Sequence, residues 1–292
     1  MSLSTDPASD QAHYAHPNKI VTPSWLSARL GTSGLRVVES DEDTMLYNIG
    51  HIPGAVSIDW ARDLNDPVTR DFIDGERFAA LMKAKGISRD DTVVIYGDTA
   101  NWWAAYTLWV FELFGHPDVR LLDGGRDAWM AEERDTSFDL PMYPPTEYPV
   151  VERADADLRA FYHEVRGAIG SDVQIVDARD HADYAGTRAP VFTAKGSYEM
   201  QRPGHIPGAI NIPWEHATQP NAYFLSAADT AAYFSQLDTR RPVIVYCFLG
   251  ARSAHTWFIL RYLLGFTDVR VYDGSWTEWG NLVQAPIERE LC

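Results

Sequence analysis

The sequence predicts an α/β protein with two tandem domains, each built on a parallel β-sheet flanked by helices. Three observations predict this class. The chain of 292 residues is long for a single domain core. The segment GHIPGAVSIDW, from Gly50, returns as GHIPGAINIPW, from Gly204, and a match of this length indicates an internal repeat. In both halves, short β-branched runs alternate with helical patterns, which is typical of parallel sheets with crossover helices.

A second, longer match extends the duplication. VVIYGDTANWWAAYTLWVFELFGHPDVRLLDGGRDAW, from Val93, pairs with VIVYCFLGARSAHTWFILRYLLGFTDVRVYDGSWTEW, from Val243. Between the repeats, residues 135–155 are proline-rich at their centre, which a helix or a central strand does not tolerate. We therefore expect an extended linker and place the boundary near Tyr148, with one domain over residues 1–147 and the other over residues 148–292.

Each half contains three runs that predict buried strands. They cover residues 35–38, 93–96 and 119–122 in the first half, and residues 173–176, 243–246 and 269–272 in the second. A helical pattern follows over residues 253–264. Ligands of open α/β sheets bind at the carboxyl ends of strands, so we expect chemistry in the loops that follow the strands VVIY, from Val93, and VIVY, from Val243.

Composition excludes several classes of function. The formal net charge of −16 argues against binding to nucleic acid, because phosphates need clustered Lys and Arg. The sequence contains neither a long apolar run nor a signal-peptide pattern, so we expect no membrane association and a cytoplasmic location. Two cysteines, Cys247 and Cys292, provide neither a disulfide framework nor a CxxC metal pair. We expect no metal and no cofactor.

The duplication lets one half serve as a control for the other, because shared residues are needed for the fold and unshared ones are candidates for function. His51 and His205 are shared, and so are Asp123 and Asp273, which favours structural roles for all four. A reactive set is found in the second half alone: Cys247 is matched by Gly97, Arg252 by Trp102, Ser253 by Trp103 and Arg179 by Asp41.

Cys247 is the candidate nucleophile. A buried cysteine is often apolar filler, but this one directly follows a predicted strand and opens a loop that leads into a helix. Backbone N–H groups and the helix dipole stabilise an anion at such a place and favour the thiolate. The loop that would surround the sulfur consists of Phe248, Leu249, Gly250, Ala251, Arg252 and Ser253.

These motifs resemble those of a known family. VIVYC with its loop, the paired GHIPGA segments and DGSWTEW resemble the tandem-domain rhodanese sulfurtransferases over nearly the whole chain. RPGHIPGAINIPW, CxxGxRSxHTWF and YDGSWTEWGxLVxAPIE resemble, more narrowly, the thiosulfate sulfurtransferases of actinobacteria. The resemblance implies about five strands in each domain and a catalytically silent first domain.

The resemblance also implies a chemistry. The Cys247 thiolate would take the outer sulfur of a donor such as thiosulfate, and sulfite would leave. Cyanide or a small thiol would then remove the sulfur from the Cys247 persulfide, while the loop amides serve as an anion hole.

The donor site departs from the best-known members of that family. Leu249 stands where their thiosulfate enzymes carry a Lys, and Asp183 stands where an Arg is expected. Our hypothesis is that other cations, together with Arg252, bind the anionic donor, with a solvated loop of paired charges as the alternative. The candidates precede the second GHIPGA segment: Arg179, Arg188, Lys195 and Arg202.

Other functions stay open at the sequence level. 3-Mercaptopyruvate is the alternative small-molecule donor. A rhodanese module that relays sulfur between proteins, or one that only regulates a partner, is a different class. Cysteine phosphatases place five residues between Cys and Arg, whereas four separate Cys247 from Arg252, so the shorter loop favours a single sulfur atom.

Overall fold

The computed structural model describes residues 3–7, 11–188 and 202–290, so Lys195 and Cys292 lie outside the described residues. The chain divides into two compact units, one formed by Met1–Ala154 with Thr218–Ala228 and the other by Asp155–Ala217 with Asp229–Cys292. This division falls after the expected boundary near Tyr148. The reason is that Tyr148 is buried in the first unit, where its hydroxyl lies 2.8 Å from Nδ1 of His116.

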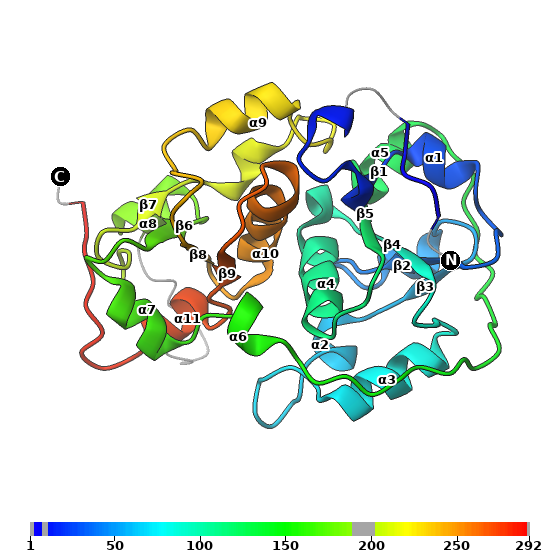
Figure 1. Ribbon diagram of the computed structural model, residues 1–292, viewed down its shortest axis with the longest axis horizontal. Helices are drawn as coiled ribbons and strands as arrows, with labels where there is room; N and C mark the ends of the chain where they lie inside the picture. Colours follow the sequence, from blue (N-terminus) through cyan, green and yellow to red (C-terminus); the bar gives the residue numbers. More distant parts are fainter. Residues whose placement is uncertain (1–2, 8–10, 189–201, 291–292) are drawn as a thin grey trace. The chain divides into compact units, whose positions relative to one another are not determined.

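The first unit contains a parallel sheet of five strands in the order β1-β5-β4-β2-β3 (Figure 1). The three predicted strands are confirmed as β2 (Leu35–Glu39), β4 (Thr92–Tyr96) and β5 (Val119–Leu122), and β1 (Ile20–Val21) and β3 (Ala55–Ser57) form the edges. Every residue of β4 is buried, as expected for the central strand of a parallel sheet. The helices are α1 (Pro23–Ser27), α2 (Trp60–Asp63), α3 (Gly75–Ala84), α4 (Trp102–Leu113) and α5 (Gly125–Ala131), with short 3-10 turns η1 (Gln11–His13), η2 (Pro17–Lys19), η3 (Leu46–Ile49) and η4 (Thr99–Asn101).

The second unit repeats this arrangement with a sheet of four strands, in the order β7-β6-β8-β9. The strands are β6 (Gln174–Asp177), β7 (Ile210–Asn211), β8 (Val243–Tyr246) and β9 (Val269–Val271). Where β1 pairs with β5 in the first unit, a single parallel bridge joins Arg159 to Val271. The three residues between α6 (Asp155–Leu158) and α7 (Tyr162–Ala168) form this single bridge in place of a fifth strand.

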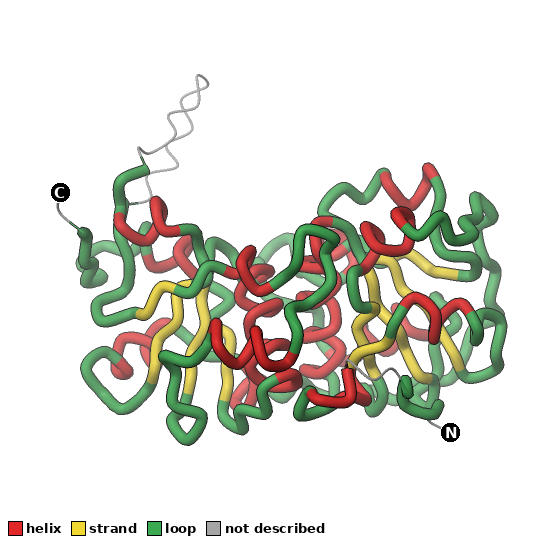
Figure 2. The backbone as a smooth tube through the Cα atoms, turned by 90° about the horizontal axis from the view of Figure 1, so that it is seen from above, coloured by secondary structure: helices red, strands yellow, loops and turns green. Residues whose placement is uncertain are grey.

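Helices cover the second sheet as they cover the first, and Figure 2 shows each group of yellow strands with red helices beside it. The remaining elements are α8 (His181–Ala185), η5 (Trp214–Ala217), α9 (Ala227–Tyr233), α10 (Ala251–Phe258) and α11 (Ser275–Trp279). The helix predicted over residues 253–264 is confirmed, but its second part, η6 (Ile259–Leu263), is wound as a π-helix. In the described part of the chain, no helix is both long and apolar enough to cross a membrane.

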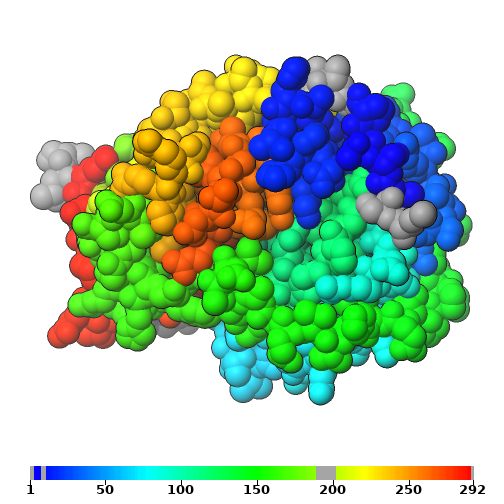
Figure 3. Space-filling view, viewed as in Figure 1, coloured from blue at the N-terminus to red at the C-terminus, as the bar shows by residue number. Residues whose placement is uncertain are grey.

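The predicted linker is extended. Residues 135–154 are all described, and they form neither a helix nor a strand beyond the bridge between His51 and Ser137. The segment packs on the first unit, where Tyr143 Oη donates to the carbonyl of Gly54 at 2.9 Å and Thr146 Oγ1 donates to that of Ile87 at 2.6 Å. In Figure 3 its green atoms lie against the cyan atoms of that unit.

Candidate active site

Cys247 lies at the carboxyl end of β8, where the chain leaves the sheet and enters α10 (Figure 1). Its side chain is 1% exposed. The backbone N–H of Gly250 donates to Sγ at 3.2 Å, and the Ser253 hydroxyl oxygen lies 3.6 Å from Sγ. Gly250 adopts a φ of +104°, a conformation that side chains disfavour and that glycine permits. Hydrogen-bond donors thus face the sulfur at the start of a helix, where the helix dipole also favours an anion.

The first turn of α11 holds the loop from the other side. The backbone N–H of Trp276 donates to the carbonyl of Cys247 at 3.1 Å, and the N–H of Thr277 donates to that of Phe248 at 3.0 Å. In the first unit, the N–H of Arg126 donates to the carbonyl of Gly97 at 2.8 Å. This backbone hydrogen bond, a shared frame for the loop, is therefore common to both repeats. The two units differ in the residue whose carbonyl accepts it, Cys247 or Gly97.

Ser275 is a site residue that the sequence reasoning missed. Its hydroxyl accepts the backbone N–H of Cys247 at 3.2 Å and donates to the carbonyl of Tyr272 at 2.7 Å. Ser275 is fully buried and has a φ of +52°, a left-handed conformation that is costly for any residue with a Cβ. A strained, buried serine that binds the backbone of the candidate nucleophile positions that residue.

In the first unit, a different residue accepts the matched backbone N–H. The N–H of Gly97 donates to Oδ1 of Asn101 at 3.0 Å, and Gly125, at a φ of +54°, matches Ser275. A Cβ on Gly125 would lie 2.3 Å from Oδ1 of Asn101, so this glycine makes room for the amide. The change from DGG to DGS in the two repeats was the sequence signal for Ser275.

Gly97 shows why the first unit has no cysteine at the position that matches Cys247. A Cβ at this position would lie 2.2 Å from the carbonyl oxygen of Ser40, a contact that real Cβ atoms do not make. A cysteine at this place would require the backbone to move. The packing of Ser40 against Gly97 thus excludes a cysteine side chain at this position of the first unit.

Comparison with known proteins agrees with this geometry. The sequence matches the family described as Rhodanese-like domain over residues 22–132 and 162–282, once for each repeat. The chain belongs to the rhodanese family.

Full-length relatives of this rhodanese are close in sequence. A protein of Corynebacterium glutamicum named thiosulfate sulfurtransferase is 58% identical over 99% of this chain and 96% of its own. A protein of Thermus thermophilus named sulfur carrier protein TtuD is 47% identical over 94% of this chain and 98% of its own. The crystal structure of YnjE has the same fold, with a TM-score of 0.79 and 26% identity, and the match covers 96% of this chain and 70% of that one.

Arg179, one of the predicted donor-binding cations, is engaged inside the second unit of this rhodanese. It is 2% exposed, and its Nη2 lies 2.6 Å from Oδ2 of Asp177 and 2.8 Å from the carbonyl oxygen of Gly204. Its guanidinium carbon also lies 4.3 Å from the ring centre of Trp276. The hydroxyl of Tyr246 donates to the same Asp177 carboxylate at 2.6 Å.

An equivalent network occupies the first unit. Glu39 takes the place of Asp177, accepts a hydrogen bond from the Tyr96 hydroxyl and lies 2.7 Å from Nη1 of Arg126. The cation is thus conserved between the repeats while its position in the chain differs. Because both units contain a buried carboxylate, tyrosine and arginine, this finding favours a structural role for Arg179 over the donor-binding role.

The other predicted cations are placed differently. Arg188 is half-exposed, and its guanidinium pairs with Asp180 at 2.6 Å and with Asp183 at 3.3 Å. Arg202 caps the end of α11, with Nη2 donating to the carbonyl of Trp279 at 3.2 Å and Nε donating to that of Gly280 at 3.1 Å. Arg252 is partly buried in the first turn of α10, next to Ser253. Among the described residues, Arg252 is therefore the predicted cation that lies in the loop around Sγ of Cys247.

The shared histidines have structural partners, as predicted. Nδ1 of His51 lies 2.9 Å from the carbonyl oxygen of Tyr47, and Nδ1 of His205 lies 2.8 Å from that of Tyr184. Each imidazole also stacks on the ring of the same tyrosine, with centroids 4.0 Å and 3.7 Å apart. These contacts fix the GHIPGA turn in both repeats and require no catalytic role.

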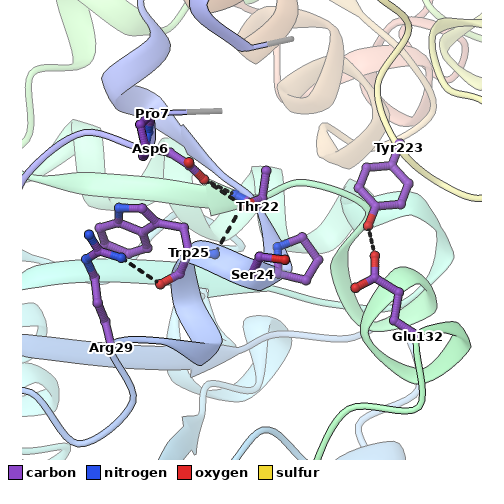
Figure 4. A pocket seen from close by; sticks show the side chains of 9 residues that line it. Asp6, Pro7, Thr22, Ser24, Trp25, Arg29, Glu132 and Tyr223 are labelled. Atoms are coloured by element: carbon purple, nitrogen blue, oxygen red, sulfur yellow. Dashed lines mark hydrogen bonds between the residues drawn. The ribbon is translucent and has the colours of Figure 1, made fainter. Parts of the chain in front are cut away.

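The first unit contains a surface cavity of about 490 Å³ (Figure 4). Its wall includes Thr22, Trp25, Arg29, Glu132 and Tyr223. The Tyr223 hydroxyl donates to the Glu132 carboxylate, and the Arg29 guanidinium carbon lies 4.4 Å from the ring centre of Trp25. These polar groups are thus already partnered, and no residue of the Cys247 loop lines the cavity.

Proposed function

We propose that this rhodanese is a thiosulfate sulfurtransferase that carries sulfane sulfur as a persulfide on Cys247. The observation that carries the proposal is the surroundings of Sγ: a buried thiol at a helix N-terminus, with Gly250 N–H at 3.2 Å, in the one unit whose packing admits a cysteine. The 58% identity to the thiosulfate sulfurtransferase of C. glutamicum supports thiosulfate as the donor.

In the first half of the cycle, the Cys247 thiolate attacks the outer sulfur of thiosulfate. A bond forms between Sγ and that sulfur, the sulfur–sulfur bond of the donor breaks, and its electron pair leaves with sulfite. One negative charge stays on the outer sulfur of the persulfide. We expect the amides of residues 248–252 to hold this charge, because the Gly250 N–H at the start of α10 already faces Sγ.

In the second half, a thiophilic acceptor such as cyanide or a small thiol attacks the outer sulfur. The bond between the two persulfide sulfurs breaks, and its electron pair returns to Sγ of Cys247. With cyanide, thiocyanate leaves and the thiolate is restored. No external oxidant or reductant is needed, and the two halves form a ping-pong cycle.

Arg252 is the cation we assign to the anionic donor. It lies in the first turn of α10, directly after the loop that surrounds Sγ of Cys247. Arg188 and Lys195 stay predictions for this role. The KM for thiosulfate tests two of the three: we expect it to rise most in Arg252→Ala and to change little in Arg188→Ala, because Asp180 and Asp183 already balance the charge of Arg188.

Intact mass tests the proposal directly. After incubation with thiosulfate, the protein is expected to gain the mass of one sulfur atom, and Cys247→Ser is expected to gain none. A parallel incubation with 3-mercaptopyruvate decides between the two donors, since a gain with that compound alone would reassign the donor. A Cys292→Ser background removes the second thiol.

Sulfur relay between proteins is the second candidate, and the 47% identity to the sulfur carrier protein of T. thermophilus favours it. The two functions differ in turnover. Continuous release of thiocyanate from thiosulfate and cyanide, in molar excess over the protein, supports the enzyme. Loading of Cys247 without discharge to cyanide or to a small thiol supports the relay.

A further inference from the structure

We propose that the Ser253 hydroxyl donates a hydrogen bond to Sγ of Cys247 whenever that sulfur carries negative charge, which makes Ser253 a second catalytic residue. The inference deepens the proposed function, since persulfide chemistry supplies the charge. It also applies to the free thiolate, so it can be tested without any sulfur donor.

The Ser253 hydroxyl has one proton and two acceptors within reach. Its oxygen lies 2.7 Å from the carbonyl oxygen of Gly250 and 3.6 Å from Sγ of Cys247, a longer contact that suits the larger radius of sulfur. Beside a neutral thiol, the proton is best placed on the carbonyl. Beside a thiolate, a turn about the Cβ–Oγ bond directs it to the charge, and hydrogen bonds to charged groups are the stronger kind.

Moving the proton leaves no buried group without a partner. The Gly250 carbonyl also accepts the backbone N–H of Ala254, at 2.9 Å, as part of α10. The helix therefore keeps this carbonyl satisfied when the hydroxyl turns away. The Ser253 proton is thus available to the sulfur at little structural cost.

Burial makes this donor important. Ser253 is fully buried and Cys247 is 1% exposed, so bulk water has little access to Sγ. A charge in such a place is costly unless protein groups bind it. Gly250 N–H and the Ser253 hydroxyl are the two donors that the structure places at this sulfur, among the residues it describes.

The first unit supports a role beyond folding. Trp103 occupies the matched position of the helix after the loop, where its ring stacks on Trp60 with centroids 3.7 Å apart. With Gly97 in place of a cysteine, this position packs an aromatic ring. The fold thus accepts an apolar residue here, and the hydroxyl occurs in the unit that has the thiol.

The chemical consequence concerns Sγ as nucleophile and as leaving group. When an acceptor attacks the outer sulfur of the persulfide, the electron pair of the breaking bond moves to Sγ. The Ser253 hydroxyl then faces a sulfur whose charge increases along the reaction. No proton is transferred, because the hydrogen bond alone stabilises the departing thiolate.

The test compares Ser253→Ala with the matched control Thr256→Val. Thr256 is a fully buried residue of the same helix, and its hydroxyl has no hydrogen-bond partner among the described residues. In a Cys292→Ser background, the ultraviolet absorbance of the Cys247 thiolate is titrated against pH. The rate at which cyanide discharges the preformed persulfide is measured in parallel.

For Ser253→Ala, we expect the midpoint of the thiolate titration to move up by about one pH unit, and discharge to slow by roughly tenfold. Thr256→Val should match the parent in both measurements. An unchanged midpoint in Ser253→Ala, or an equal shift in Thr256→Val, would overturn the proposal. If the midpoint moves but thiosulfate does not load Cys247, the assigned donor is wrong and the role of Ser253 stands.

Discussion

Ser275 and Gly125 occupy the same turn of the two repeats in nearly the same left-handed conformation, with φ values of +52° and +54°. The serine accepts the N–H of Cys247, whereas the glycine leaves space for the Asn101 amide that accepts the N–H of Gly97. The acceptor of this backbone N–H therefore differs between the repeats. In the first unit it is Asn101, in the loop before α4, and in the second unit it is Ser275, in the turn after β9. This exchange frees the loop of the second unit to surround a sulfur atom.

Substitutions at Ser275 separate strain from hydrogen bonding. Ser275→Ala keeps the left-handed Cβ and leaves the buried Cys247 N–H unpaired, so it should lower the free energy of unfolding by about 1–3 kcal/mol. Ser275→Gly loses the same hydrogen bond but relieves about 1 kcal/mol of strain. Urea unfolding should therefore rank wild type above Ser275→Gly, and Ser275→Gly above Ser275→Ala. A glycine variant less stable than the alanine variant would contradict this reading of the turn.

Asp41 is a second residue whose position in the repeat matters, because it matches Arg179. Burial raises the pKa of Asp41 to about 9, and the adjacent carboxylate of Glu39 adds to the rise. Asp41 therefore keeps its proton in the folded state and loses it on unfolding, between about pH 4 and about pH 9. Because the folded state binds more protons in this window, the contribution of Asp41 to stability falls as the pH rises.

Asp41→Asn should remove this pH dependence. The amide oxygen can still accept the backbone N–H of Asp98, which lies 2.8 Å from Oδ1 of Asp41, and the amide carries no charge to desolvate. The melting temperature of wild type should fall more steeply than that of the variant between about pH 5 and about pH 8. If the melting temperatures of the two proteins fell equally with pH over this range, Asp41 would not be the protonated group.

At the scale of elements, the hydrophobic pattern was sufficient wherever a strand was long and buried. The three predicted strands of each half were found because β-branched runs fill β2, β4, β5, β6, β8 and β9. The edge strands β1, β3 and β7, of two or three residues each, were not predicted. β9 is an edge strand of three residues as well, but its run VRVY matches the VRLL run of β5 in the other repeat. The π-helical turn at Ile259–Leu263 is also invisible in sequence, because its apolar residues fit an ordinary helix.

The two buried ion pairs can be tested by removing their cations. They join Arg179 to Asp177 and Arg126 to Glu39. Arg179→Met leaves a buried carboxylate without its cation, so the free energy of unfolding should fall by about 3–5 kcal/mol. Arg126→Met is the matched control in the first unit and should show a loss of similar size. A stable Arg179→Met protein with a raised KM for thiosulfate would instead restore Arg179 as a donor-binding residue.

At the scale of the whole molecule, the repeat predicted two similar units and located the reactive loop in the second one. The candidate nucleophile and its loop followed from comparing the repeats, because Gly97 and Cys247 differ within a shared frame. Ser275 was missed because its partner, the N–H of Cys247, is a backbone group, and the change from DGG to DGS does not show what the serine binds. For two of the predicted cations, sequence does not show that Asp177 already pairs with Arg179, or that Asp180 and Asp183 already pair with Arg188.

The division into units shows another limit of sequence. Residues Thr218–Ala228 lie in the second repeat along the chain but belong to the first unit. The N–H of Phe224 donates to Oδ1 of Asp123 at 3.0 Å, and the Tyr14 hydroxyl donates to the carbonyl of Leu225 at 2.6 Å. Such contacts join residues about a hundred or more positions apart, and local patterns carry no information about them.

The proposal that Cys247 carries the transferred sulfur can be tested by the intact mass of the protein after incubation with thiosulfate and removal of the donor. We expect a gain of one sulfur atom on the wild type, its loss on addition of cyanide, and no gain on Cys247→Ser. A wild type whose mass does not change, or a Cys247→Ser protein that gains sulfur equally, would contradict it.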